Sequence, residues 1–230
     1  MKRGSNGFTL VEIAIVLVII GLLLGGVLKG QELITNARVR NLISQQDGIK
    51  AAFFGFEDRY RAVPGDYSQA DININCGATP CLAGNGNGRI QAGTGGAIHE
   101  EILAWQHLNA AGFLLGSYSM ANSGVTAPDD ANNPRNFYSG IYLQLVFDSN
   151  WGPTGNAVSK HHLNTGSLVP VDILAEVDRK IDDAKPYSGG FQFSTYTPAG
   201  NVAPDPATCI SGSDWNVNGG DTNCGAASLF

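Results

Sequence analysis

Glu12 is an acidic side chain in a strongly apolar part of the sequence, where an ionised group is costly. Residues 13–28 carry no charge, and Lys29 is the next charged residue. A carboxylate inside a membrane-spanning segment costs about 3 kcal/mol or more unless it has a partner. An acid at such a position indicates a functional site, and we expect Glu12 to pair with a group of opposite charge.

The segment that holds Glu12 is long enough to cross a bilayer. Phe8 to Leu28 is 21 residues, which as a helix measures roughly 31 Å and matches the apolar thickness of a membrane. Lys2 and Arg3 precede it and predict a cytoplasmic N-terminus. A secretory signal peptide would be shorter and end at a site of small residues, whereas a plain signal anchor gives no reason for Glu12.

A short motif overlaps the start of this segment. The residues Gly7-Phe8-Thr9-Leu10-Val11-Glu12, after a basic leader, resemble the prepilin cleavage and methylation motif of type IV pilins and type II secretion pseudopilins. The resemblance covers about the first 30 residues. It implies that a membrane-bound prepilin peptidase cuts after Gly7 and methylates the new N-terminus at Phe8. It also implies that Glu12 acts in filament assembly.

Cleavage after Gly7 would create a positively charged partner for Glu12. An ammonium group at Phe8 lies four residues from Glu12, and positions i and i+4 share one face of a helix. Glu12 could instead meet the ammonium group of a neighbouring subunit. The implied partners are the peptidase, an inner-membrane assembly platform, and copies of this or a related chain. The head would lie in the periplasm before assembly, and the filament in the periplasm or on the cell surface.

A single long helix should connect the membrane segment to the rest of the chain. No proline occurs between Phe8 and Pro64, and apolar residues recur at helical spacing as far as Tyr60. The expected parts are a cleaved leader at 1–7, a membrane or filament-core half of the helix at 8–29, an amphipathic half at 30–62, and a periplasmic or extracellular head at 63–230.

The pattern of the head predicts an α+β fold, and the resemblance to pilins implies that the amphipathic half of the helix packs against an antiparallel sheet. Short helices are expected over 98–115 and 170–184, and strands over 141–147 and 190–197. Alternation in the second strand predicts that it is half-buried. Residues after 201 carry few structural signals apart from two cysteines.

The four cysteines fall into two local pairs, Cys76/Cys81 and Cys209/Cys224. Neither pair has the C-x-x-C spacing of zinc sites, and no histidine lies at ligand spacing. We predict two disulfides, each closing a short loop, and hence an oxidising compartment. Four free thiols, or one of the other connectivities, are the alternatives.

A glycine-rich segment around Asn85 and Asn87 resembles the middle of an EF-hand calcium loop. It lacks the acidic residues that begin and end such a loop. A different calcium site could use Asn85 and Asn87 together with Asp66 or Asp71. The alternative interpretation is a simple glycine-rich turn, and no other cofactor is indicated.

The remaining polar residues favour a structural protein. A net charge of −6 with scattered basic residues gives no support for nucleic acid as a partner. Nucleophile and phosphate-binding motifs are missing, so we predict that the protein is not an enzyme. The four histidines are expected to be ordinary surface or interface residues, and Asp178, Asp182 and Asp183 to lie on a solvated helix face.

We therefore predict a subunit of a type IV pilus-like or type II secretion filament, either pilin or pseudopilin. The alternative is a periplasmic binding or enzymatic domain tethered by an uncleaved N-terminal anchor.

Overall fold

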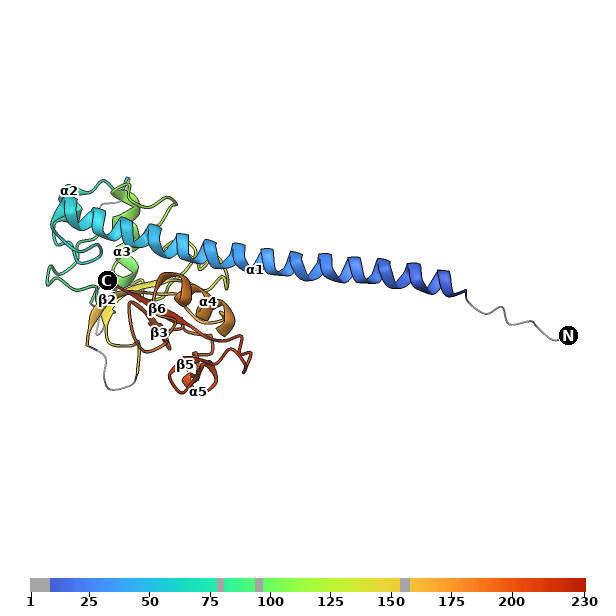
Figure 1. Ribbon diagram of the computed structural model, residues 1–230. Coiled ribbons are helices and arrows are strands. Elements are labelled where there is room, and N and C mark those ends of the chain that lie inside the picture. The colour runs from blue at the N-terminus through green and yellow to red at the C-terminus, as the bar shows by residue number, and fades with distance from the viewer. Residues whose placement is uncertain (1–8, 78–80, 94–96, 154–157) are drawn as a thin grey trace. The chain divides into compact units, whose positions relative to one another are not determined.

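The computed structural model describes residues 9–77, 81–93, 97–153 and 158–230 (Figure 1). Gly7 and Phe8 lie outside the described residues. The chain divides into two compact units, residues 1–38 and 39–230.

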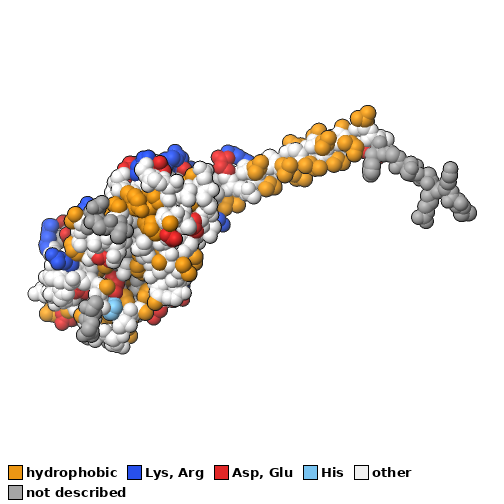
Figure 2. Space-filling model, turned by 90° about the horizontal axis from the view of Figure 1, so that it is seen from below, with side chains coloured by type: hydrophobic (Ala, Val, Ile, Leu, Met, Phe, Trp, Pro, Cys, Tyr) orange, Lys and Arg blue, Asp and Glu red, His pale blue; other side chains and the backbone are white. Residues whose placement is uncertain are grey.

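Helix α1 (Leu10–Tyr60) is 51 residues long and belongs to both units. Its apolar side chains from Leu10 to Leu28 are exposed, and Figure 2 shows hydrophobic side chains covering this part of the helix. Among the described helices, α1 is the one that is long and apolar enough to cross a membrane. The expected long helix is confirmed over its described residues.

The second half of α1 belongs to the head and carries a narrow buried stripe. Leu42, Ile49, Phe53 and Phe56 are at most 3% exposed, and their spacing of seven, four and three residues places them on one face of the helix. Lys50 beside this stripe is only partly buried, whereas the polar Gln46 lies within the stripe and is buried. The predicted packing of this half against the head is confirmed.

The head contains an antiparallel sheet of four strands in the order β1-β2-β6-β3, and a separate two-stranded hairpin. The four strands are β1 (Gln144–Asp148), β2 (Lys160–Asn164), β3 (Phe191–Phe193) and β6 (Ala226–Leu229), and the hairpin is β4 (Ile210–Ser211) with β5 (Asp214–Trp215). The short helices are α2 (Ala70–Asn73), α3 (Glu100–Ala110), α4 (Val171–Ile181) and α5 (Pro206–Cys209). The expected α+β class is confirmed.

Helix α3 is shorter than the sequence predicted. It ends at Ala110 because Gly112 adopts a φ of +82°, a conformation that glycine reaches without steric cost. The N–H of Phe113 then donates to the carbonyl of Leu108 at 2.9 Å, and the N–H of Gly112 donates to Asn109 at 3.0 Å. This pair of bonds is a Schellman motif, which satisfies the last carbonyls of the helix.

One further expectation for the head was wrong, and one segment was left without a prediction. Strand β3 is covered on both faces, since Gln192 is only 7% exposed and lies between the buried Phe191 and Phe193. The segment after residue 201, which showed few signals, forms α5, β4, β5 and the central strand β6. Short strands of small residues carry little hydrophobic periodicity, so the sequence pattern did not show them.

Both predicted disulfides are confirmed. Cys76 is bonded to Cys81, and Cys209 to Cys224, so all four cysteines are paired. The second bond joins α5 to the segment before β6. Each closes a local loop and restricts the unfolded chain.

Phe56 should contribute strongly to the stability of the head. Its side chain projects from α1 and is fully buried. Its ring lies close to the rings of Tyr67, His107 and Phe113. We expect Phe56→Ala to lower the free energy of unfolding by about 3–5 kcal/mol, because it removes a large side chain from a closed core. Denaturant unfolding of the full chain in detergent measures this. Phe137→Ala, at a side chain that is 75% exposed, is the control and should change little. Equal losses in both variants would contradict the core assignment.

Candidate functional site

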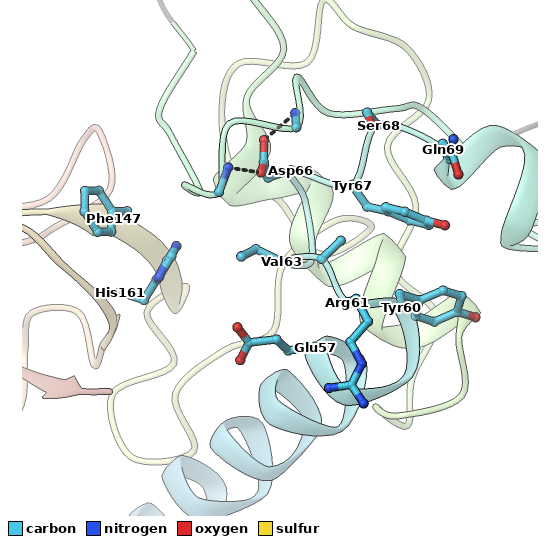
Figure 3. A pocket seen from close by; sticks show the side chains of 13 residues that line it. Glu57, Tyr60, Arg61, Val63, Asp66, Tyr67, Ser68, Gln69, Phe147 and His161 are labelled. Atoms are coloured by element: carbon cyan, nitrogen blue, oxygen red, sulfur yellow. Dashed lines mark hydrogen bonds between the residues drawn. The ribbon is translucent and has the colours of Figure 1, made fainter.

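The loop of residues 85–91 wraps around two carboxylates from other parts of the head. Asp66, which is 2% exposed, accepts backbone N–H bonds from Gly86 at 2.7 Å, Asn87 at 3.0 Å and Gly88 at 2.6 Å. Figure 3 shows this carboxylate against the loop. Glu100, at the start of α3, accepts the N–H groups of Asn85 and Gln91 at 3.0 and 3.1 Å. The two acids therefore fix the path of the glycine-rich loop.

Of the four residues predicted for calcium, Asn85, Asn87 and Asp66 lie together at this loop. Their side-chain oxygens, however, accept hydrogen bonds from backbone N–H groups. The Asn85 side chain accepts from the N–H of Asn87, and the Asn87 side chain accepts from the N–H of Arg89. Both oxygens of Asp66 also accept backbone N–H groups. The fourth residue, Asp71, is exposed on α2. A calcium site at these residues stays a prediction.

Glu100 has an unusual protonation equilibrium. Its removal from water, together with the nearby Asp66 carboxyl, raises the pKa of Glu100 to about 7. The N–H bonds from Asn85 and Gln91 act in the opposite direction. With a pKa of about 7, Glu100 changes charge near neutral pH.

An open groove lies beside the Asp66 loop. It has a volume of about 720 Å³ and is bordered by the end of α1, the segment after it, and the edge of β1 and β2. Figure 3 shows Glu57, Tyr60 and Arg61 on one side, and Phe147 and His161 on the other. The lining mixes aromatic and charged side chains.

Asp66 and His161, two titratable residues that line the groove, are not placed for proton transfer. Asp66 is bonded to backbone donors, as described above. His161 accepts the N–H of Ile90 at 3.3 Å, and burial together with the neighbouring His162 lowers the pKa of His161 to about 4. A general base needs a pKa closer to the working pH.

Two histidines are core residues, so the expectation that all four are surface or interface residues was wrong. His107 and His162 are both fully buried. The Nδ1 of His107 accepts the N–H of Gly65 at 2.9 Å, and its Nε2 lies 2.9 Å from the carbonyl of Leu82. This arrangement requires a neutral ring with the proton on Nε2, and burial lowers the pKa of His107 to about 4.

The acidic run at the end of α4 is not a uniformly solvated face either. Asp182 and Asp183 are exposed, but Asp178 is fully buried. Its Oδ2 accepts the indole N–H of Trp215 at 2.7 Å. Burial and the two neighbouring acids raise the pKa of Asp178 to about 6.

At the other end of the chain, Thr9 and Glu12 form a reciprocal cap at the start of α1. The Thr9 hydroxyl accepts the N–H of Glu12 at 3.2 Å, and Glu12 Oε2 accepts both the N–H and the hydroxyl of Thr9 at 2.8 Å. This is a capping box, and the pattern Thr-x-x-Glu shows it in the sequence. The cap was not predicted, because the charge of Glu12 alone does not indicate it.

The cap leaves part of Glu12 available. Its described hydrogen bonds all use Oε2, and no lysine or arginine among the described residues forms an ion pair with it. Oε1 can therefore accept a further donor without breaking the cap. Further along the exposed part of α1, Gly21 and Gly25, and again Gly26 and Gly30, are spaced four residues apart, and a Cβ at any of them would meet open space. Such pairs allow close approach of another helix.

Comparison with known proteins concerns this same end of the chain. Residues 2–28 match the family model described as the prokaryotic N-terminal methylation motif. The chain carries this motif. The motif is typical of type IV pilins and pseudopilins. The match ends within α1 and does not include the head.

No curated protein and no solved structure matches the chain. The methylation motif contains Gly7, Phe8, Thr9 and Glu12. Of these, the structure describes Thr9 and Glu12, and it brings them into direct contact.

The neutral state of His107 should make the head sensitive to acid. The pKa of this histidine is near 6.5 in the unfolded chain and about 4 in the folded one. Its contribution to the free energy of unfolding is therefore complete above pH 6.5 and is lost as the pH falls towards 4. We expect about 2 kcal/mol less stability at about pH 5 than at about pH 7.5 from this group. Glu100 and Asp178, whose pKa values are raised, act in the opposite direction.

The contribution of His107 is isolated by His107→Gln, which keeps a donor and an acceptor but does not titrate. Denaturant unfolding at both pH values should show a smaller acid-dependent loss in the variant than in the wild type. Identical losses would contradict the assignment.

Proposed function

We propose that this protein is a structural subunit of a type IV pilus-like or type II secretion filament. The observation that carries the proposal is the methylation motif, with Glu12 inside it, at the start of an apolar helix that could span a membrane. In this proposal the leader 1–7 is removed by a prepilin peptidase, Phe8 is methylated, and the chain works by assembly and not by catalysis.

Before assembly, the apolar half of α1 would hold the subunit in the inner membrane, with the head on the periplasmic side. Lys2 and Arg3 support this orientation, since basic residues stay on the cytoplasmic side. In the filament, the same half would pack among the helices of further copies. The glycines at four-residue spacing support close helix packing there.

Glu12 would select the position of each new subunit. A buried carboxylate is tolerated when an ammonium group pairs with it, and is strongly unfavourable when it is left alone. A neighbouring Phe8 ammonium could pair through the open Oε1 while Oε2 keeps the cap to Thr9. The charge pair would thus favour one register of adjacent helices over the others.

The groove beside Asp66 favours a second candidate function, a tethered binding domain. In that case the N-terminus would stay uncleaved and the protein would remain in the membrane fraction. Shearing and co-purification separate the two functions. A filament subunit should appear in the sheared material or co-purify with assembly proteins, whereas a tethered domain should stay with the membranes.

The processing step is tested by mass spectrometry of the N-terminal peptide from native membranes or sheared material. We expect a chain that begins at Phe8 and carries one added methyl group. A chain that still begins at Met1 would support the tethered domain, and one that begins beyond Leu28 would indicate a secreted protein.

The role of the Glu12 charge can be separated from its role in the cap. Glu12→Gln removes the charge, yet glutamine also completes a capping box. Thr9→Val removes the two cap bonds that use the hydroxyl, retains the bond from the backbone N–H of residue 9, and keeps the charge. We expect Glu12→Gln to insert into the membrane normally and to lose most of its filaments, whereas Thr9→Val should still assemble. Filament yield by shearing and electron microscopy measures both. Loss of filaments in Thr9→Val alone would show that the cap is the essential feature.

A further inference from the structure

The last turn of α4 and the loop after it gather three aspartates that the proposed filament role does not use. One carboxylate oxygen from each of Asp178, Asp182 and Asp183 lies within 4.8 Å of an oxygen from each of the other two. All three belong to the head, and their side chains come from the last turn of α4 and the first residues after it. Three negative groups at this separation repel one another unless a proton or a cation lies among them.

Asp178 supplies an oxygen that has no partner. The residue is fully buried, and its Oδ2 accepts the indole N–H of Trp215. Its Oδ1 is buried as well and has no donor in hydrogen-bond geometry, although the nearby N–H of Ala184 does stabilise the charge. A buried carboxylate oxygen without a partner is costly. It is expected to have a ligand that the protein alone does not supply.

The other two aspartates are held in place by the loop. Asp182 accepts the N–H groups of Gly190 and Phe191 with Oδ2, and its Oδ1 takes part in no hydrogen bond that the structure describes. Asp183 accepts the N–H of Lys185 at 2.9 Å and the hydroxyl of Ser188 at 2.6 Å. These bonds orient both carboxylates before any ligand arrives.

The neighbouring lysines do not neutralise the cluster. Lys185 pairs with Asp214 at 2.5 Å, and Lys180 pairs with Glu176 at 2.9 Å. Lys50 of α1 is near enough to Asp182 for electrostatic attraction, but it forms no ion pair with it among the described residues, and its Nζ lies 5.8 Å from the ring centre of Phe230. The three aspartates therefore keep an excess of negative charge.

We infer that Asp178, Asp182 and Asp183 bind a divalent cation that prefers oxygen ligands, with calcium the best fit. Calcium binds carboxylate oxygens at about 2.3–2.6 Å with flexible geometry. Oxygens bound to one such ion lie at most about 5 Å apart, and the three aspartates offer oxygens within this limit. Magnesium needs shorter bonds and a stricter octahedron. The site is separate from the Asp66 loop and independent of the filament proposal.

Bound calcium would join three parts of the head. Asp178 belongs to α4 and contacts Trp215 of β5, while Asp182 is bonded to the first residues of β3. The ion would hold the end of α4 against both, and we expect it to raise the melting temperature of the head.

Terbium luminescence can detect the site in the full chain in detergent. Tb³⁺ occupies calcium sites and emits strongly when an indole close to it is excited, and Trp215 is bonded to one of the proposed ligands. We expect saturable emission that added Ca²⁺ reverses. Trp215→Phe should lose most of the emission while Ca²⁺ still raises the melting temperature.

Asp183→Asn tests the ligands, because this residue is exposed and its replacement should leave the fold intact, as circular dichroism would show. We expect at least a tenfold loss of Tb³⁺ and Ca²⁺ affinity. Asp172→Asn, at an exposed acid in the first turn of the same helix, is the matched control and should bind normally. No saturable emission, or equal affinity in the two variants, would overturn the inference. Binding that survives in Asp183→Asn but is lost in Asn87→Ala would move the ion to the Asp66 loop and overturn it as well.

Discussion

Inside a membrane the backbone has no water to bond with, so each N–H and C=O must find a partner within the chain. A continuous helix meets this requirement everywhere except in its first and last turns, where four groups are left over. In α1 the last turn lies in the head, and the first turn lies at the apolar end. The bonds between Thr9 and Glu12 supply acceptors for two of the orphan donors at that end. An acid in an apolar helix thus has a structural reason as well as an electrostatic one.

The same helix changes its surroundings along its length. From Leu10 to Leu28 apolar side chains are exposed around the helix, as expected for contact with lipid or with other helices. From Val39 onward only a narrow stripe is buried. A single element can therefore serve as an anchor and as a core helix of the head, because the composition of its faces changes while its backbone geometry does not.

The sequence predicted the parts of the fold that have strong periodicity or local chemistry. The buried stripe of α1, the helix that follows Pro170 and both disulfides belong to this group. Strand β6 was not predicted, since Ala226 and Ala227 carry no clear pattern and the strand is defined by its pairing with β2 and β3. The end of α3 was overestimated because Gly112 was not weighed as a stop signal.

The functional residues also divide into those that the local sequence indicates and those that only the tertiary structure reveals. Glu12 could be singled out from its surroundings in the sequence, because an acid within an apolar run is unusual. The burial of His107 and Asp178 could not, since it depends on Gly65, Leu82 and Trp215, which are distant in the sequence. Polar residues become core residues only when the tertiary structure brings them hydrogen-bond partners.

The position of β6 also sets an order of events during synthesis. This strand pairs with both β2 and β3, yet it follows every other strand in the chain. A nascent chain that has emerged only as far as β5 has two separate sheet edges and a Cys209 without its partner. The head can become a single cooperative unit only after residues 224–229 are present, by which time the apolar start of α1 has long been available to the membrane. Insertion would thus come first and completion of the head last, so that an unfinished chain is already anchored while its sheet edges are still open.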